Sequence, residues 1–110
     1  MIIQPAEIVG IPFPYSDMST RKRRPILVLN SPDQRGDFTG LAVTSVLAKE
    51  KSFCIRAESM RSGKLPKTSW VRYDKIFTLN SSLVINRYGA LQNGVFKKII
   101  NRLCDHLGCE

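Results

Sequence analysis

Histidine and cysteine are scarce in this 110-residue chain, and their scarcity excludes several kinds of chemistry. His106 is the only histidine, so an acid–base pair of two histidines is unavailable. Cys54, Cys104 and Cys109 are odd in number and form no Cys-x-x-Cys pair, which argues against a disulfide framework and indicates reduced thiols. Residues 104–109 (CDHLGC) also lack the spacing of a zinc knuckle, so we expect no metal site.

The chain also lacks long apolar runs. Its apolar content is 43%, yet no run approaches the ~20 apolar residues of a membrane span. The first five residues are too short for a signal peptide and carry no charged leader. At this length the chain is expected to form one domain with one core. The sequence therefore predicts a single soluble domain over residues 1–110, located in the cytoplasm.

Acidic residues are few and scattered. The chain has nine acidic and 17 basic residues, which gives a formal net charge of +8 and a pI near 9.8. The acidic residues show no D-x-D or E-x-x-H spacing, whereas two-metal hydrolysis needs clustered carboxylates. A small, strongly basic domain most often binds a polyanion, and RNA or DNA is the default candidate.

The most informative segment is a run of four cations, residues 21–24, which leads into Pro25 and an apolar stretch. Residues 26–29 read as a strand buried on both faces. Pro25 favours an extended conformation at Arg24, so we expect this guanidinium at the rim of the sheet. Such a planar, permanently charged group suits a phosphodiester. For the three cations before it, a solvated loop is an equal alternative.

Strands dominate the first four-fifths of the chain. Apolar runs and alternation, bounded by turn residues, predict six of them, and basic loops are expected at 14–23 and 60–67. An apolar stripe at three- and four-residue spacing predicts a C-terminal amphipathic helix, with Asn93 as N-cap and Gly108 as the stop. Pro12 and Pro14 are expected to interrupt pairing at the end of the first strand. The expected strands are 7–13, 26–30, 38–46, 52–57, 69–79 with a possible break at 74–75, and 83–88, followed by the helix at 92–107.

The helix must cover one face of the sheet. The predicted fold class is therefore mainly β, a small and strongly curved antiparallel sheet or open barrel with a C-terminal α-helix.

Five segments, in order, resemble the PemK/MazF-like family of toxin–antitoxin systems. They are residues 11–15 (IPFPY), 24–29 (RPILVL), 41–45 (LAVTS), 69–76 (SWVRYDKI) and 86–91 (NRYGAL). The family pairs an R-P-x-L-V strand with a later apolar strand that ends in Thr or Ser. The resemblance implies an SH3-like barrel, usually homodimeric, that cleaves single-stranded RNA without metal or other cofactor.

The resemblance also implies a catalytic pair, the arginine before the proline and the hydroxyl on the next strand. These fall on Arg24 and Thr44, with Ser45 as the rival if the register slips by one residue. The family's usual opening Gly-Asp is Ala6-Glu7 here, which moves any role of an early acidic residue to Glu7.

Electrostatic catalysis is the chemistry that these residues allow. RNA carries its own nucleophile, the 2′-hydroxyl, so the protein need only align it and stabilise the phosphorane. Preorganised donors at such a developing charge contribute ~3–4 kcal/mol each. We assign Arg24 charge stabilisation, since the pKa of arginine in proteins exceeds ~12.

Further RNA contacts are expected from aromatic and basic residues. Tyr15 beside the first basic loop could stack on a base, whereas Phe13 is expected in the core and Trp70 in core or dimer packing. Solvated charge is the alternative reading for the basic residues. The basic candidates for RNA binding are Arg21, Lys22, Arg23, Lys49, Lys51, Arg61, Lys64 and Lys67.

Two partners and one alternative function complete the expectations. A homodimer built near the helix and the late strands would join two basic surfaces into a groove. A cognate, acidic and partly disordered antitoxin would cover that groove. The alternative is a protein on the same barrel that binds nucleic acid, or DNA gyrase as CcdB toxins do, without catalysis.

Overall fold

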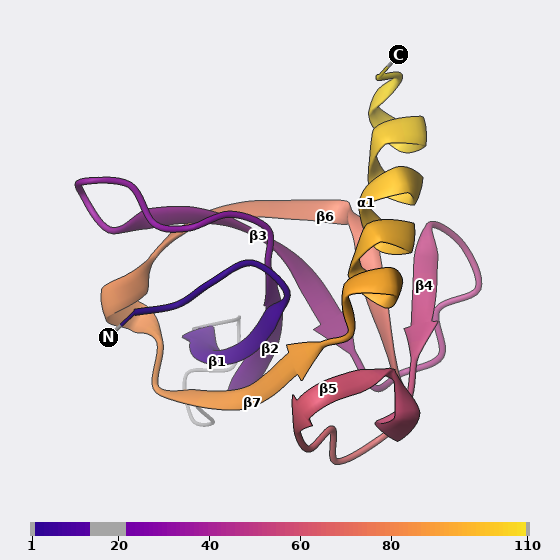
Figure 1. The fold of residues 1–110 in the computed structure, drawn as a ribbon, viewed down its shortest axis with the longest axis horizontal. Helices are drawn as coiled ribbons and strands as arrows, with labels where there is room; N and C mark the ends of the chain where they lie inside the picture. Colours follow the sequence, from indigo (N-terminus) through magenta and orange to yellow (C-terminus); the bar gives the residue numbers. More distant parts are fainter. Residues whose placement is uncertain (1, 14–21, 110) are drawn as a thin grey trace.

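The structure, a computed structural model, describes residues 2–13 and 22–109. These residues form seven strands, two short 3-10 turns and one α-helix (Figure 1). The predictions for Tyr15 and Arg21 concern residues outside this described part. The elements are β1 (Glu7–Phe13), β2 (Lys22–Val28), β3 (Asp37–Thr44), β4 (Ser52–Ile55), η1 (Ala57–Ser59), β5 (Met60–Gly63), β6 (Ser69–Asn80), η2 (Ser81–Leu83), β7 (Asn86–Leu91) and α1 (Asn93–Leu107).

The strands form one curled sheet in the order β4-β6-β3-β2-β1-β7-β5, and every neighbouring pair is antiparallel. Helix α1 packs against β6, and its C-terminal part extends beyond that strand (Figure 1). The expected fold, a strongly curved antiparallel sheet with a C-terminal helix, is confirmed. No helix among the described residues combines the length and the apolar content needed to cross a bilayer.

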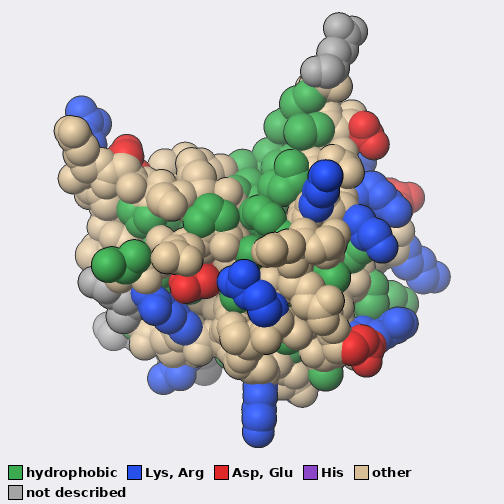
Figure 2. Space-filling model, viewed as in Figure 1, with side chains coloured by type: hydrophobic (Ala, Val, Ile, Leu, Met, Phe, Trp, Pro, Cys, Tyr) green, Lys and Arg blue, Asp and Glu red, His purple; other side chains and the backbone are tan. Residues whose placement is uncertain are grey.

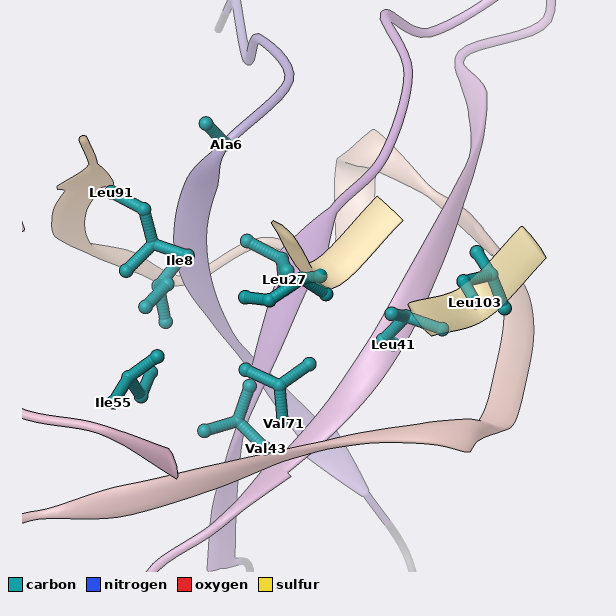
Figure 3. Packing of buried hydrophobic residues seen from close by; sticks show 10 residues of the cluster. Ala6, Ile8, Leu27, Leu41, Val43, Ile55, Val71, Leu91 and Leu103 are labelled. Atoms are coloured by element: carbon teal, nitrogen blue, oxygen red, sulfur yellow. The ribbon is translucent and has the colours of Figure 1, made fainter. Parts of the chain in front are cut away.

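Strand β2 is buried on both faces, as its apolar run predicts. Ile26, Leu27 and Val28 are all fully buried. Leu27 belongs to a first core cluster, in which side chains of β1, β3, β6 and β7 point toward a common interior that Ile99 and Leu103 of α1 also line (Figure 3). Ile26 and Val28 belong to a second cluster on the opposite face. The sheet therefore has two apolar faces, and α1 covers only the first.

Strand β2 begins at Lys22, earlier than the predicted start at residue 26, and ends at Val28. Lys22, Arg23 and Arg24 are therefore part of the strand, because β1 continues to pair with β2 as far as Phe13 and Lys22. Pro12 does not interrupt this pairing but lies opposite Arg23. The described pairing of β1 with β7 ends at Gly10, so no neighbouring strand there requires the missing amide of Pro12.

The second half of the chain differs from the prediction in three places. Residues 60–63, predicted as loop, form β5, which pairs with β7 along the sheet edge. The last strand runs from Asn86 to Leu91, later than predicted, because residues 81–83 form a 3-10 turn. The N-cap of α1 is Gln92 rather than Asn93, whereas Gly108 ends the helix in the left-handed conformation, as expected.

The departure from the family's opening Gly-Asp coincides with unusual backbone geometry. Ala6 has a φ of 77°, a region that costs a residue with a Cβ roughly 1–2 kcal/mol and that glycine enters freely. The carboxylate of Glu7 lies 3.7 Å from Arg87 on the neighbouring strand β7. Glu7 therefore has a structural partner across the sheet.

Candidate active site

The pairing of β2 with β3 sets the position of the catalytic candidates. Ile26 lies opposite Ala42, and extending this antiparallel register by two residues places Arg24 opposite Thr44. Because side chains alternate along a strand, Arg24 and Thr44 share the face of the sheet that carries Ile26. Ser45 belongs to the opposite alternation. The extended register therefore favours Thr44 as the partner of Arg24, while the hydroxyls of Thr44 and Ser45 both belong to residues that line the hollow described next.

Arg24 and Thr44 line one hollow of about 320 Å³, which we name the first hollow. Pro25 and Val43 are apolar residues of its wall, and Tyr88 of β7 also lines it. It thus combines cations, hydroxyls and flat apolar surface. The complete lining is Arg23, Arg24, Pro25, Val43, Thr44, Ser45, Val46, Leu65, Pro66, Lys67, Ser69 and Tyr88.

The loop between β5 and β6 is anchored at both ends, which holds its residues over the first hollow. At one end the amide of Lys64 donates to the carbonyl of Tyr88 at 2.9 Å. Close by, Gly63 and Gly89 face each other across the β5–β7 pair, where a Cβ on either would lie within 2.1 Å of a carbonyl oxygen. At the other end the buried hydroxyl of Ser69 donates to the carbonyl of Lys67 at 2.9 Å.

Thr44 lies where three hollows meet. The second hollow, about 250 Å³, is lined by Arg24, Pro25, Ile26, Ala42, Val43, Thr44, Arg72, Lys75 and Phe77. The third, about 380 Å³, is lined by Thr44, Val46, Leu47, Ala48, Lys49, Glu50 and Arg72. A chain-like ligand could therefore pass over Thr44 and remain in a depression on both sides.

The hydroxyl of Thr44 is held by the turn that follows β3. The backbone amide of Val46 donates to its Oγ1 at 3.1 Å. Among the hydrogen bonds of the described residues this oxygen is only an acceptor, so its hydrogen can be donated to a ligand. Thr44 is half-buried and Arg24 is exposed. The arrangement offers a fixed hydroxyl donor beside a guanidinium fork, which suits an oxygen atom that gains negative charge.

The other RNA-binding candidates divide into two groups. Arg23 and Lys67 line the first hollow and Lys49 lines the third, so these three join Arg24 and Thr44. Lys51, Arg61 and Lys64 are exposed and line none of the three hollows. Lys22 belongs to β2.

Arg61 is instead directed to the start of α1. Its Nη1 donates to Oδ1 of Asn93 at 3.5 Å, which gives both residues a structural contact.

Sequence reasoning missed several residues of the hollows. Leu65 and Pro66 lie in the segment predicted only as a basic loop, and no local pattern marks Tyr88. Arg72 and Lys75 line the second hollow from β6. Arg72 alternates with Trp70 along its strand, a signal that could have identified it.

Among residues 2–13 and 22–109, no three His, Cys, Asp or Glu side chains gather in a group that could hold a metal ion. Cys54, Cys104 and Cys109 are free thiols. A hydrogen bond with the thiol of Cys109 is the main cause that raises the pKa of Cys104. These two thiols lie at the end of α1, and neither lines the hollows around Thr44.

Solved structures similar to this one include toxin–antitoxin complexes. A MazE–MazF complex from Deinococcus radiodurans superimposes with a TM-score of 0.79 at 18% identity, covering 100% of both chains. A mycobacterial endoribonuclease in complex with its cognate antitoxin gives 0.74 at 17% identity, covering 98% of this chain and 95% of that one. The Mycobacterium tuberculosis toxin MazF-mt6 gives 0.72 at 14% identity, covering 94% and 98%. At these identities the likeness is one of fold.

Among curated protein sequences, none matches this chain. A family model does: the model of the PemK-like, MazF-like toxin of type II toxin–antitoxin systems matches residues 4–107. This match spans the five motifs and the helix on which the resemblance is based. The chain therefore belongs to the PemK-like, MazF-like family of type II toxins.

Proposed function

We propose that this protein is a metal-independent endoribonuclease toxin that cleaves single-stranded RNA. The observation that carries the proposal is the placement of Arg24, near the start of β2, and Thr44, at the end of β3, in one hollow. Family membership and the endoribonuclease among the similar structures support it. We further propose that residues 1–110 act as a single domain in the cytoplasm, where its substrate is available.

In the proposed reaction the 2′-oxygen of the substrate attacks the adjacent phosphorus. The proton of the 2′-hydroxyl passes to water, the bond from phosphorus to the 5′-oxygen breaks, and that oxygen takes up a proton from water, which leaves a 2′,3′-cyclic phosphate and a 5′-hydroxyl. Arg24 stabilises the charge that develops on the phosphorane oxygens, and the hydroxyl of Thr44 donates to the same group. Arg23, Lys49 and Lys67 lie along the hollows, where they can contact neighbouring phosphates.

The proposed regulator is a cognate antitoxin that competes with RNA for this surface. A similar mycobacterial endoribonuclease is bound to its cognate antitoxin, and a similar MazF from Deinococcus radiodurans is bound to MazE. The net charge of +8 favours an acidic and partly disordered partner segment, because opposite charge speeds association and steers it to the groove.

The first prediction concerns metal dependence. The purified protein should cut a long single-stranded RNA in EDTA at the rate observed with magnesium, because the proposed donors are Arg24 and Thr44. The products should end in a 2′,3′-cyclic phosphate or 3′-phosphate and in a 5′-hydroxyl, which mass spectrometry identifies. Cleavage that disappears in EDTA and returns with magnesium would contradict the mechanism. RNA binding without any cleavage would favour the non-catalytic alternative.

The second prediction concerns assembly. We propose a homodimer in which two basic surfaces form one groove, built on faces near α1 and the late strands. Hydrophobic side chains gather along the flank of α1 where it leaves the sheet (Figure 2), and Leu107 at its end is 57% exposed. An isologous interface needs such a self-complementary apolar patch. Light scattering at micromolar concentration should give twice the mass of the chain, and the mass of a monomer would refute the dimer.

A further inference from the structure

Strand β6 carries a three-residue bulge beside the candidate active site. Its pairing with β3 passes from Leu41–Ile76 directly to Ala42–Arg72, so residues 73–75 have no partner on β3. The break expected at residues 74–75 is thus an interruption of the pairing within one continuous strand. Bulges re-aim side chains and are frequent next to active sites. This one delivers Arg72 and Lys75 to the second hollow.

The second hollow is as positively charged as the first, which is lined by Arg23, Arg24 and Lys67. Arg24, Arg72 and Lys75 line it, and its lining includes no acidic residue. The third hollow, in contrast, contains Glu50 beside Lys49 and Arg72. Three cations around a half-buried hydroxyl form a cradle for one phosphate group, because a phosphate has several oxygens that can be contacted from different sides.

Asp74 holds Arg72 without entering the cradle. Its Oδ2 lies 3.2 Å from Nη2 of Arg72, and the side chains of Asp74 and Arg72 are 19% and 34% exposed, respectively. Asp74 is not part of the lining of the second hollow. Nε of Arg72 and Oδ1 of Asp74 are buried and have no hydrogen-bond partner in the structure. The carboxylate thus holds Nη2 of the guanidinium, while Arg72 lines the second hollow.

We propose that Arg72 and Lys75 are phosphate-binding residues that complete, with Arg24, the site for the reacting phosphodiester at Thr44. This inference rests on the proposed function, and it adds two residues from β6 that neither the motif on β2 nor the one on β3 contains. Arg72 makes the planar, fixed contact, and Lys75, which is exposed, contributes a mobile point charge. Asp74 is a positioning residue for Arg72.

The test separates binding from cleavage. Arg72→Gln and Lys75→Gln are compared with wild type for binding of a short, mixed-sequence, fluorescein-labelled 2′-O-methyl oligoribonucleotide, which cannot be cleaved. Anisotropy is followed over a series of NaCl concentrations. We expect each variant to bind about five- to tenfold more weakly at low salt. The slope of log affinity against log salt should become shallower by about 0.7 for each phosphate of the single strand that the variant no longer neutralises.

The matched controls remove the same charge elsewhere. Arg35→Gln alters an exposed arginine in the β2–β3 turn, and Lys98→Gln alters an exposed lysine on α1. Neither residue lines the three hollows, so both variants should bind and cleave as wild type does. Circular dichroism verifies the fold. Lys75→Gln remains informative if Arg72→Gln does not fold, because Lys75 is exposed and belongs to neither core cluster.

The outcomes distinguish this inference from the proposed function. If the wild type cleaves RNA but both variants bind the probe with wild-type affinity and slope, the inference is wrong and the function stands. If the variants lose affinity relative to their controls but the wild type cuts no 2′-hydroxyl RNA, the phosphate site stands and the nuclease proposal is wrong. A wild type that does not bind the probe overturns the inference as well.

Discussion

Arg24→Ala and Thr44→Ala should each reduce RNA cleavage by about 100- to 1,000-fold while the protein stays folded. This magnitude is typical for the loss of one preorganised donor to a developing charge. Arg24 is an exposed residue of β2, Thr44 is the last residue of β3, and neither belongs to a core cluster, so each substitution should change the free energy of unfolding little. Single-turnover cleavage of a defined RNA measures the loss, and thermal unfolding measures the stability.

Conservative variants test whether the group removed is the one proposed. Thr44→Ser keeps the hydroxyl and should retain most activity, whereas Thr44→Val keeps the shape and should be as slow as Thr44→Ala. Arg24→Lys keeps the charge but loses the fork, so it should restore only part of the rate. Ser45→Ala is the control for register and should cleave at nearly the wild-type rate. Wild-type cleavage by both alanine variants would contradict the assignment.

Gly89→Ala should have the largest effect on stability and should also reduce cleavage. A Cβ at Gly89 would lie 2.1 Å from the carbonyl oxygen of Ser62, and the φ of 144° is strained for any residue with a side chain. The strands β5 and β7 would have to separate, which should lower the free energy of unfolding by at least about 2 kcal/mol. The wall of the first hollow would move with them, since the amide of Lys64 donates to the neighbouring Tyr88.

The same substitution at another glycine is the control. Gly94 lies near the start of α1, and an added Cβ would meet no atom within 4 Å. Gly94→Ala should therefore raise the free energy of unfolding by roughly 0.5–1 kcal/mol through helix propensity. The denaturant concentrations at the unfolding midpoints of the two variants should shift in opposite directions from that of the wild type. Equal stability of Gly89→Ala and wild type would show that the close approach of β5 and β7 is not required.

Much of this fold was predictable because its strongest signals are local. The apolar run at residues 26–29 predicted a strand buried on both faces, and Ile26 to Val28 are fully buried. The apolar spacing that includes Ile99 and Leu103 predicted the helix that covers the first core cluster. Gly108 predicted where that helix ends. The resemblance predicted the family, which the family model confirms over residues 4–107.

The predictions that were wrong or missing concern features that depend on pairing between distant segments. The strand character of Arg23 and the tolerance of Pro12 follow from their position opposite each other on β1 and β2, which no local pattern shows. The strand β5 exists because it pairs with β7, which comes much later in the chain. For the same reason the sequence did not predict that Tyr88 lines the first hollow. The bulge that brings Arg72 and Lys75 to Arg24 depends on the register between β3 and β6, which no local pattern shows.

The most direct test of the account uses an RNA in which a single 2′-hydroxyl is replaced by hydrogen. The cleaved linkage is first mapped on an all-ribose oligonucleotide, and the 2′-deoxynucleotide is then placed on the 5′ side of that linkage. The account predicts that the protein binds this oligonucleotide with unchanged affinity but leaves the linkage uncut, because Arg24 and Thr44 stabilise an attack that now has no nucleophile. Cleavage at the same linkage, with a 5′-phosphate on the product, would contradict it.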